Sequence, residues 1–102
     1  MTPYVVAPGA RADLDRIWDY IVARASAEVA TDFVWKFHGA FRTIASSPRA
    51  GVDMPGLPPG DVRKFPMGNY LIYYRALPGK IVIARVLHGK RRQRRAFLGK
   101  PE

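Results

Sequence analysis

The residues with the clearest chemical potential lie near the C-terminal end of the sequence, in the stretch RVLHGKRRQRRAF from Arg85 to Phe97. His88 can exchange a proton near neutral pH, because the ordinary pKa of histidine is about 6.5. The basic side chains that follow it can bind phosphate or carboxylate groups. Three interpretations are open: an active site, an arm that binds nucleic acid, or a solvated basic tail. A lone histidine at the end of a strand is also a common structural residue.

The charge of the chain is unevenly distributed. Residues 1–61 contain six Lys or Arg and seven Asp or Glu, whereas residues 62–100 contain eleven Lys or Arg and no acidic residue. The formal net charge is +9. Solubility alone gives no reason for acids to be absent from so long a segment. The pattern favours an anionic partner, which could be nucleic acid, an acidic protein segment or an anionic membrane. Of these, a membrane is the weakest candidate, since the basic segment is too short for a sizeable amphipathic helix.

Length and composition narrow the class of protein further. A chain of 102 residues with 48% hydrophobic content predicts one globular domain over residues 1–102. The absence of cysteine excludes disulfides, thiolate zinc sites and cysteine nucleophiles. The two histidines are far apart without nearby clustered carboxylates, so we expect no metal site and no cofactor. No signal peptide or membrane span is evident, and we expect a soluble cytoplasmic protein.

Hydrophobic periodicity predicts the elements that position the basic residues. Residues 4–6 are β-prone, and two amphipathic helices follow, the first beginning near Pro8. The stripe of the first helix is Leu14, Ile17, Trp18, Ile21 and Val22. The stripe of the second helix is Ala30, Phe33, Val34, Phe37, Phe41 and Ile44. Ser26 is the expected N-cap between them, and residues 46–48 should end the second helix. Because the connection is short, the two helices should form an antiparallel hairpin.

Three strand-like runs, over residues 62–67, 70–76 and 81–88, follow a proline- and glycine-rich loop at residues 48–60. The breaks at Gly68-Asn69 and Pro78-Gly79 are short enough to make the runs an antiparallel meander. The predicted fold is therefore α+β: an N-terminal strand, an antiparallel helical hairpin, then a three-stranded antiparallel meander with the hairpin on one face.

Two-residue turns would also fix which strand residues share a face. The predicted core side carries Phe65, Met67, Tyr70, Ile72, Tyr74, Ile81, Ile83 and Leu87, interrupted by Arg63 and Arg85. The predicted opposite side carries Val62, Lys64, Leu71, Tyr73, Arg75, Val82, Ala84, Val86 and His88. Three basic or titratable side chains would thus lie together on the side away from the core.

Arginines within strands need partners, because an unpaired buried charge is costly. Arg75 and Arg85 should therefore reach solvent, a binding partner or an acidic neighbour. The available acids on the first helix are Asp13, Asp15 and Asp19. Trp35 lies off the apolar stripe of its helix, so we expect it to be exposed.

Three segments together resemble the ParE/RelE superfamily of small bacterial toxins from type II toxin–antitoxin pairs. They are ARADLDRIWDYI in the first helix, VRKFPMGNYLIYYR across the first two meander strands, and IVIARVLHGKR in the last strand. Their order and spacing match the family over nearly the whole chain. The resemblance implies the RelE/ParE-like toxin fold and a cognate antitoxin, acidic or amphipathic, that wraps and neutralises the toxin.

The RelE-like branch of this superfamily cleaves messenger RNA on the ribosome. Attack by a 2′-hydroxyl needs a proton acceptor, a proton donor and cations that hold the phosphate. The residues that could supply these roles are Lys64, Arg75, His88 and Arg91. Two positions argue against this branch, because Leu71 and Phe97 stand where many such nucleases carry an arginine and a tyrosine.

The ParE-like branch is favoured, and its characterised members trap DNA gyrase on cleaved DNA. On this hypothesis the protein has no catalytic residues of its own and is not a hydrolytic enzyme, and nucleic acid belongs to its target complex. The residues predicted to bind the target or the antitoxin are Arg75, Arg85, His88, Lys90, Arg91, Arg92, Arg94 and Arg95. The chain departs from ParE-like sequences in lacking an acid shortly after His88. A third hypothesis is an inactive toxin fold that serves only as a binding module.

Overall fold

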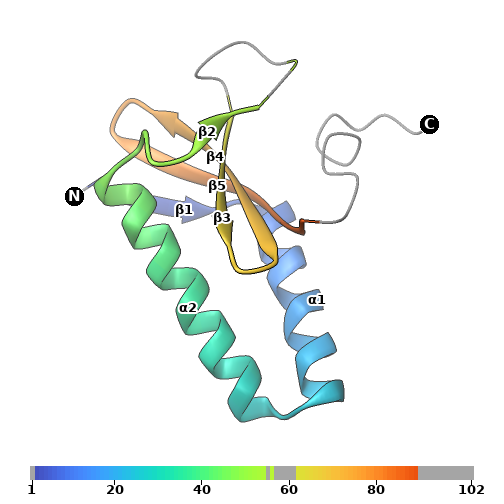
Figure 1. The fold of residues 1–102 in the computed structure, drawn as a ribbon. Coiled ribbons are helices and arrows are strands. Elements are labelled where there is room, and N and C mark those ends of the chain that lie inside the picture. Colours follow the sequence, from blue (N-terminus) through green and yellow to red (C-terminus); the bar gives the residue numbers. More distant parts are fainter. Residues whose placement is uncertain (1, 55, 57–61, 90–102) are drawn as a thin grey trace.

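The computed structural model describes residues 2–54, 56 and 62–89. A five-stranded sheet packs against a hairpin of two helices that extends well beyond it (Figure 1). The elements are β1 (Tyr4–Val6), α1 (Pro8–Arg24), α2 (Ala27–Ser46), β2 (Val52–Asp53), β3 (Arg63–Met67), β4 (Tyr70–Leu77) and β5 (Lys80–His88). The predicted α+β class and the order of strand, helical hairpin and meander are confirmed.

Local sequence signals set the bounds of the two helices. Pro8 occupies the first turn of α1, where its missing N–H is not needed. The side chain of Ser26 accepts a hydrogen bond of 3.1 Å from the Val29 N–H, which confirms the predicted N-cap of α2. α2 ends at Ser46, as the Ser-Ser-Pro sequence predicted. Within the described residues, neither helix has the length and apolar character needed to cross a bilayer.

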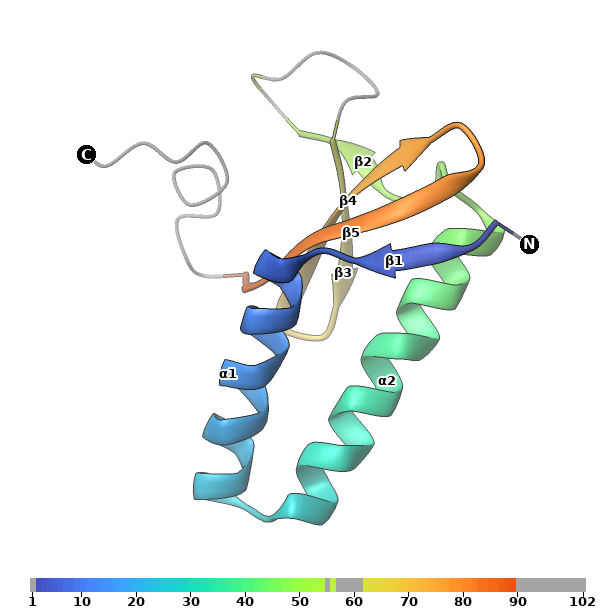
Figure 2. The ribbon, with the colours of Figure 1, turned by 180° about the vertical axis from the view of Figure 1, so that it is seen from behind.

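The sheet has the strand order β1-β5-β4-β3-β2. β3, β4 and β5 form the predicted antiparallel meander, with Gly68 and Gly79 at positive φ in its two-residue turns. β1 joins the sheet parallel to β5, at one edge (Figure 2). β2 pairs with β3 at the other edge, within a segment for which only a loop was predicted.

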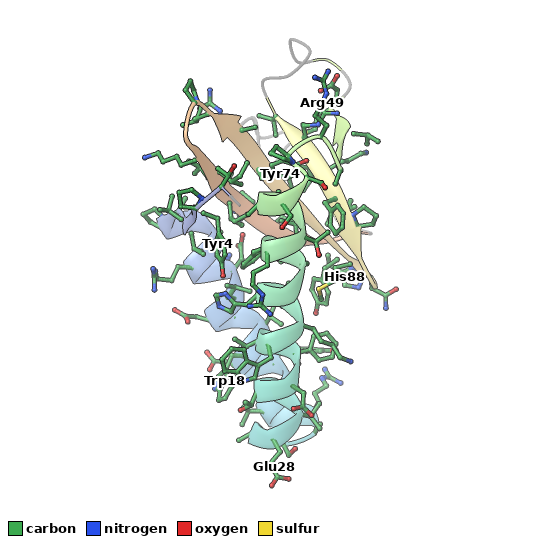
Figure 3. All side chains as sticks on the ribbon, turned by 90° about the vertical axis from the view of Figure 1, so that its left-hand side faces the viewer. Tyr4, Trp18, Glu28, Arg49, Tyr74 and His88 are labelled. Atoms are coloured by element: carbon green, nitrogen blue, oxygen red, sulfur yellow. The ribbon has the colours of Figure 1, made fainter. Side chains whose placement is uncertain are left out.

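The main core lies between the sheet and the helical hairpin. Its fully buried members are Ala10, Phe37, Phe41, Ile44, Ile72, Tyr74, Ile81, Ile83 and Val86. Both helices contribute residues of their predicted apolar stripes, with Leu14, Ile17 and Phe33 packed against this core. Val22 was also predicted in the stripe of the first helix, but it is 38% exposed. In Figure 3, Tyr74 lies behind the C-terminal part of α2, near Arg49, while Glu28 marks the far tip of the hairpin.

A β-bulge in β5 changes the predicted arrangement of side chains. Tyr74 pairs with Ile83 and Tyr73 pairs with Arg85, so Ala84 is an extra residue without a partner on β4. Beyond this point every residue of β5 points to the face opposite the one predicted. Val86 is therefore buried in the main core, only 2% exposed, instead of lying on the opposite face.

The assignment of residues 85–88 to the two faces was accordingly wrong. Leu87 pairs with Leu71 and packs against a second, smaller cluster of Met54, Val62 and Tyr73. His88 pairs with Tyr70, a residue that packs on the main core. We call the side away from the helices the open face. Its strand positions are Val5, Val52, Lys64, Pro66, Leu71, Tyr73, Arg75, Leu77, Lys80, Val82, Arg85 and Leu87.

Candidate functional site

The open face gathers most of the basic side chains of the described strands. Lys64 pairs directly with Tyr73, and Tyr73 pairs on its other side with Arg85. Arg75 lies two residues further along β4 on the same face. Lys80 was not predicted as a site residue, although extending the strand alternation by one residue would have placed it on this face. No carboxylate occupies an open-face strand position in the part of the chain that the structure describes.

His88 does not join these basic residues. Its ring packs edge-on against Tyr70, with the ring centroids 5.5 Å apart, on the helix side of the sheet. The two rings border a surface pocket of about 240 Å³ that also has Leu71, Asn69 and Gly89 in its wall. Burial, and secondarily the neighbouring Tyr20 phenol, raises the pKa of Tyr70. Neither Lys64 nor Arg75 borders this pocket.

The predicted nuclease set is thus divided between the two sides of the sheet. Lys64 and Arg75 lie on the open face and His88 lies on the other, while Arg91 falls outside the described residues. Tyr73, the phenol surrounded by the basic residues, is 1% exposed, and burial raises its pKa to about 12. A phenol with that pKa remains protonated at neutral pH and does not accept a proton there.

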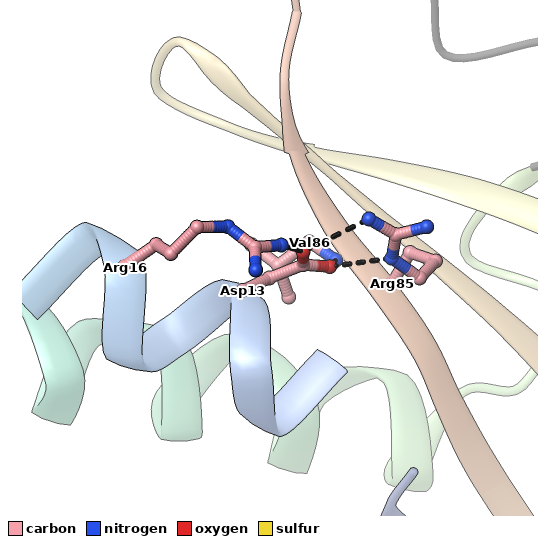
Figure 4. Close-up of polar contacts among 4 residues, drawn as sticks. All are labelled: Asp13, Arg16, Arg85 and Val86. Atoms are coloured by element: carbon pink, nitrogen blue, oxygen red, sulfur yellow. Dashed lines mark hydrogen bonds and ion pairs between the residues drawn. The ribbon is translucent and has the colours of Figure 1, made fainter. Parts of the chain in front are cut away.

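Arg85 makes its described contacts within the chain, with Asp13 of α1 (Figure 4). Its Nε donates to Asp13 Oδ2 at 2.7 Å and a terminal nitrogen donates to Oδ1 at 3.0 Å. Arg16, one turn along α1, also donates to Oδ1. The hydrogen bond from Arg85 to Asp13 raises the pKa of Arg85, outweighing the opposite effect of burial. The expectation of an acidic partner on the first helix is confirmed for Arg85.

The same carboxylate completes the hydrogen bonding of β5. The backbone N–H of Val86 donates to Asp13 Oδ2 at 2.9 Å. β1 pairs with β5 only from Ile81 to Ile83, so Asp13 takes the position of a partner strand beyond that point. Asp13 is 2% exposed, and its carboxylate accepts hydrogen bonds from Arg16, Arg85 and the Val86 N–H. The sequence identified Asp13 as a possible acidic partner for Arg85. It contains no pattern that predicts the contact of Asp13 with the Val86 N–H.

His38 links α2 to the edge strand β1. The Tyr4 hydroxyl lies 2.9 Å from His38 Nδ1, and the His38 ring packs edge-on against Phe41, with centroids 5.3 Å apart. Burial, and secondarily the charge of Arg42, lowers the pKa of His38 below its ordinary 6.5. These contacts give His38 a structural role, joining α2 to β1. The neighbouring Trp35 is 65% exposed, as predicted.

The lowered pKa of His38 predicts a pH-dependent stability. The unfolded chain binds a proton near pH 6.5 more readily than the folded chain does, so the free energy of unfolding should fall as the pH is lowered below about 6.5. His38→Asn, which keeps an acceptor near Tyr4, should show a weaker fall between about pH 7 and pH 5 in urea unfolding curves. Arg42→Gln removes only the smaller cause and should keep most of the slope. Identical slopes for the wild type and His38→Asn would contradict this assignment.

The remaining predicted contact residues, Lys90, Arg91, Arg92, Arg94 and Arg95, lie outside the described residues. Among the residues that are described, no three His, Asp or Glu side chains gather in a way that could hold a metal ion. The described part of the site is therefore a cationic sheet face around a buried tyrosine, with one histidine on the opposite side.

Solved structures contain the same fold. A chain of the chromosomal ParDE TA system from P. aeruginosa matches with a TM-score of 0.72 at 24% sequence identity, over 86% of this chain and 96% of that chain. A chain of the toxin–antitoxin complex RelBE2 from Mycobacterium tuberculosis matches with a TM-score of 0.59 at 26% identity, over 85% of this chain and 96% of that one. The fold is that of the ParE/RelE class of toxins.

Sequence comparison defines the branch. The family described as the ParE toxin of the type II toxin-antitoxin system, parDE, matches residues 4–93. Toxin ParE1 of Caulobacter vibrioides is 34% identical over 99 residues, which are 97% of this chain and all of that protein. Toxin ParE1 of Mycobacterium tuberculosis is 33% identical over 86 residues, 83% of this chain and 87% of that protein. The chain belongs to the ParE toxin family and is the toxin of a type II toxin–antitoxin system.

Proposed function

We propose that this toxin inhibits DNA gyrase by trapping the enzyme on cleaved DNA, without hydrolysing a substrate of its own. A cognate antitoxin, acidic or amphipathic, neutralises it in the cytoplasm. The charge of the chain suits both roles, because a +9 protein is attracted to an acidic antitoxin and to a target that holds DNA.

One observation carries the choice of gyrase over messenger RNA. The β-bulge at Ala84 turns His88 away from Lys64 and Arg75, so the sheet separates the candidate proton-transfer group from the candidate phosphate-binding groups. Transesterification of RNA needs these groups around one phosphate, within hydrogen-bonding reach of the reacting atoms. The open face also presents Leu71, which cannot bind a phosphate, and its tyrosine is buried. Such a surface suits binding better than proton transfer.

A cleavage-complex assay tests the proposal. Purified toxin added to gyrase, ATP and supercoiled plasmid should increase the amount of linear DNA released on protein denaturation, and prior addition of the antitoxin should abolish the increase. Absence of any increase in linear DNA would exclude the gyrase target.

The ribonuclease alternative is tested separately, in a translating extract. We expect no toxin-dependent messenger RNA fragments from the wild type, and none from the Arg75→Ala or His88→Ala variants. Fragments that appear with the wild type and disappear with His88→Ala would instead identify a ribonuclease.

A further inference from the structure

The helical hairpin carries aromatic and basic side chains together on the side where His88 lies. Tyr20 of α1 is 55% exposed, and the guanidinium carbon of Arg24 lies over its ring, 4.6 Å from the ring centroid. On α2, the Lys36 ammonium nitrogen lies 5.6 Å from the centroid of the Phe33 ring. Each of these two rings therefore has a cation directly beside it.

Tyr70 connects the rings of the two helices to the end of β5. Its ring packs edge-on against Phe33, with the centroids 6.4 Å apart, and against His88 at 5.5 Å. Tyr20 also lies near Tyr70, because its phenol is the second cause, after burial, that raises the pKa of Tyr70. In Figure 3, His88 and Trp18 lie on opposite sides of α2. We call the surface on the His88 side the aromatic-basic face, and its residues are Tyr20, Arg24, Phe33, Lys36, Tyr70 and His88.

The six residues of this face include two cations and no acid. The ion pairs of the described residues include neither Arg24 nor Lys36. Asp32 lies one turn before Lys36 on α2 and offsets part of its charge, so Arg24 is the principal cation. The sequence that follows Gly89, in the wall of the pocket, has five further basic residues within six positions. An anionic ligand therefore suits this face.

The combination of rings and cations points to single-stranded nucleic acid. A strand with unpaired bases stacks them on aromatic side chains and places its phosphates at neighbouring cations. The exposed ring of Tyr20, with Arg24 beside it, offers both contacts to one nucleotide. The pocket of about 240 Å³ that Tyr70 and His88 border can receive a further base, and Asn69 in its wall has hydrogen-bonding groups.

Two other occupants fit this face less well. Duplex DNA keeps its bases stacked inside the double helix, so it would leave the exposed Tyr20 ring without a stacking partner. A second copy of this chain would bring together two molecules that each carry a net charge of +9, and such like charges repel.

We propose that the aromatic-basic face binds a single strand of the DNA that gyrase holds in the cleaved state. Bases stack on Tyr20 and enter the pocket beside Tyr70, and phosphates pair with Arg24 and Lys36. This inference rests on the proposed function for the source of the DNA. The binding itself is measured without gyrase, so a failure of the inference and a failure of the gyrase target are seen in different assays.

The test compares two double variants with matched chemical changes. Tyr20→Ser with Arg24→Gln alters the face, whereas Trp35→Ser with Arg42→Gln makes the same kinds of change at exposed positions of α2 outside it. The probe is a labelled oligothymidylate of about 12 nucleotides, and binding is followed by fluorescence anisotropy at low salt. We expect the first variant to bind at least about tenfold more weakly than the wild type and the second to stay within about twofold.

Tyr20→Phe supplies a further readout, because stacking needs the ring and not the hydroxyl. This variant should bind the oligothymidylate as the wild type does, whereas Tyr20→Ser should not. If the first double variant does not fold, Tyr20→Ser alone is compared with Trp35→Ser alone.

Four outcomes would overturn the inference. The first is no binding of the oligothymidylate by the wild type, and the second is an equal loss in the two double variants, which would show that only total charge matters. The third is tighter binding of a duplex than of the single strand. The fourth is a loss of affinity of the first variant for the protein encoded beside the toxin gene, with unchanged binding of the oligothymidylate. If the expected loss is seen but the toxin releases no linear DNA in the gyrase assay, the single-strand site stands and the gyrase target fails.

Discussion

Asp13→Ala should lower the free energy of unfolding by about 3 kcal/mol, because it removes the only described acid against Arg85 and leaves the Val86 N–H without its acceptor. The Asp13 side chain is 2% exposed and that of Arg85 is 27% exposed, so water replaces the lost contacts poorly. Arg16, at 65% exposed, should contribute little to the loss. Urea unfolding curves followed by circular dichroism measure the change.

Asp15→Ala is the matched control on the same helix. Asp15 is exposed, and the change should alter the free energy of unfolding by no more than about 0.5 kcal/mol. A further variant, Asp13→Ala with Arg85→Ala, should be less destabilised than the sum of the two single changes, because it removes both charges together. Equal unfolding midpoints for Asp13→Ala and Asp15→Ala would show that the contacts of the Asp13 carboxylate with β5 do not stabilise the fold.

Local signals were sufficient for most of the fold. The helices were predicted from apolar stripes, the start of α2 from Ser26, and the meander from its two glycine-containing turns, and each of these depends on residues close together in sequence. The parallel pairing of β1 with β5 was not predicted, because it joins segments that are separated by both helices and three strands. Alternation within a single strand carries no information about which distant strand lies beside it.

The candidate site was predicted only in part, and the bulge explains the difference. No glycine or proline marks Ala84 as an extra residue, so simple alternation placed His88 with Lys64 and Arg75. The contact that accompanies the bulge runs from the Val86 N–H to Asp13, which lies 73 residues earlier in the chain. An assignment that depends on such a contact requires three-dimensional coordinates. By contrast, an acidic partner for Arg85 was predicted because burying an unpaired charge is costly, and Asp13 is that partner.

Gly51→Ala should also destabilise the protein by about 3 kcal/mol, through overpacking and the loss of a buried hydrogen bond. A Cβ at Gly51 would lie 2.6 Å from the backbone oxygen of Lys64 and 2.8 Å from the Tyr74 hydroxyl. The Gly51 N–H donates to that hydroxyl at 2.8 Å, and the hydroxyl donates to the Pro48 oxygen at 2.7 Å. Because Tyr74 is 0% exposed and Lys64 contributes a strand carbonyl, neither can move away at low cost.

Gly39→Ala provides a control of opposite sign. Gly39 lies inside α2, where a Cβ would meet only the end of the flexible Arg42 side chain, at 3.9 Å. Alanine in a helix interior is more favourable than glycine by about 0.5–1 kcal/mol, so this variant should be more stable than the wild type. If both variants were stabilised to a similar degree, the segment from Pro48 to Gly51 would not be held against Tyr74. Stability changes of opposite sign in the two variants would show that close packing requires a glycine at position 51 but not at position 39.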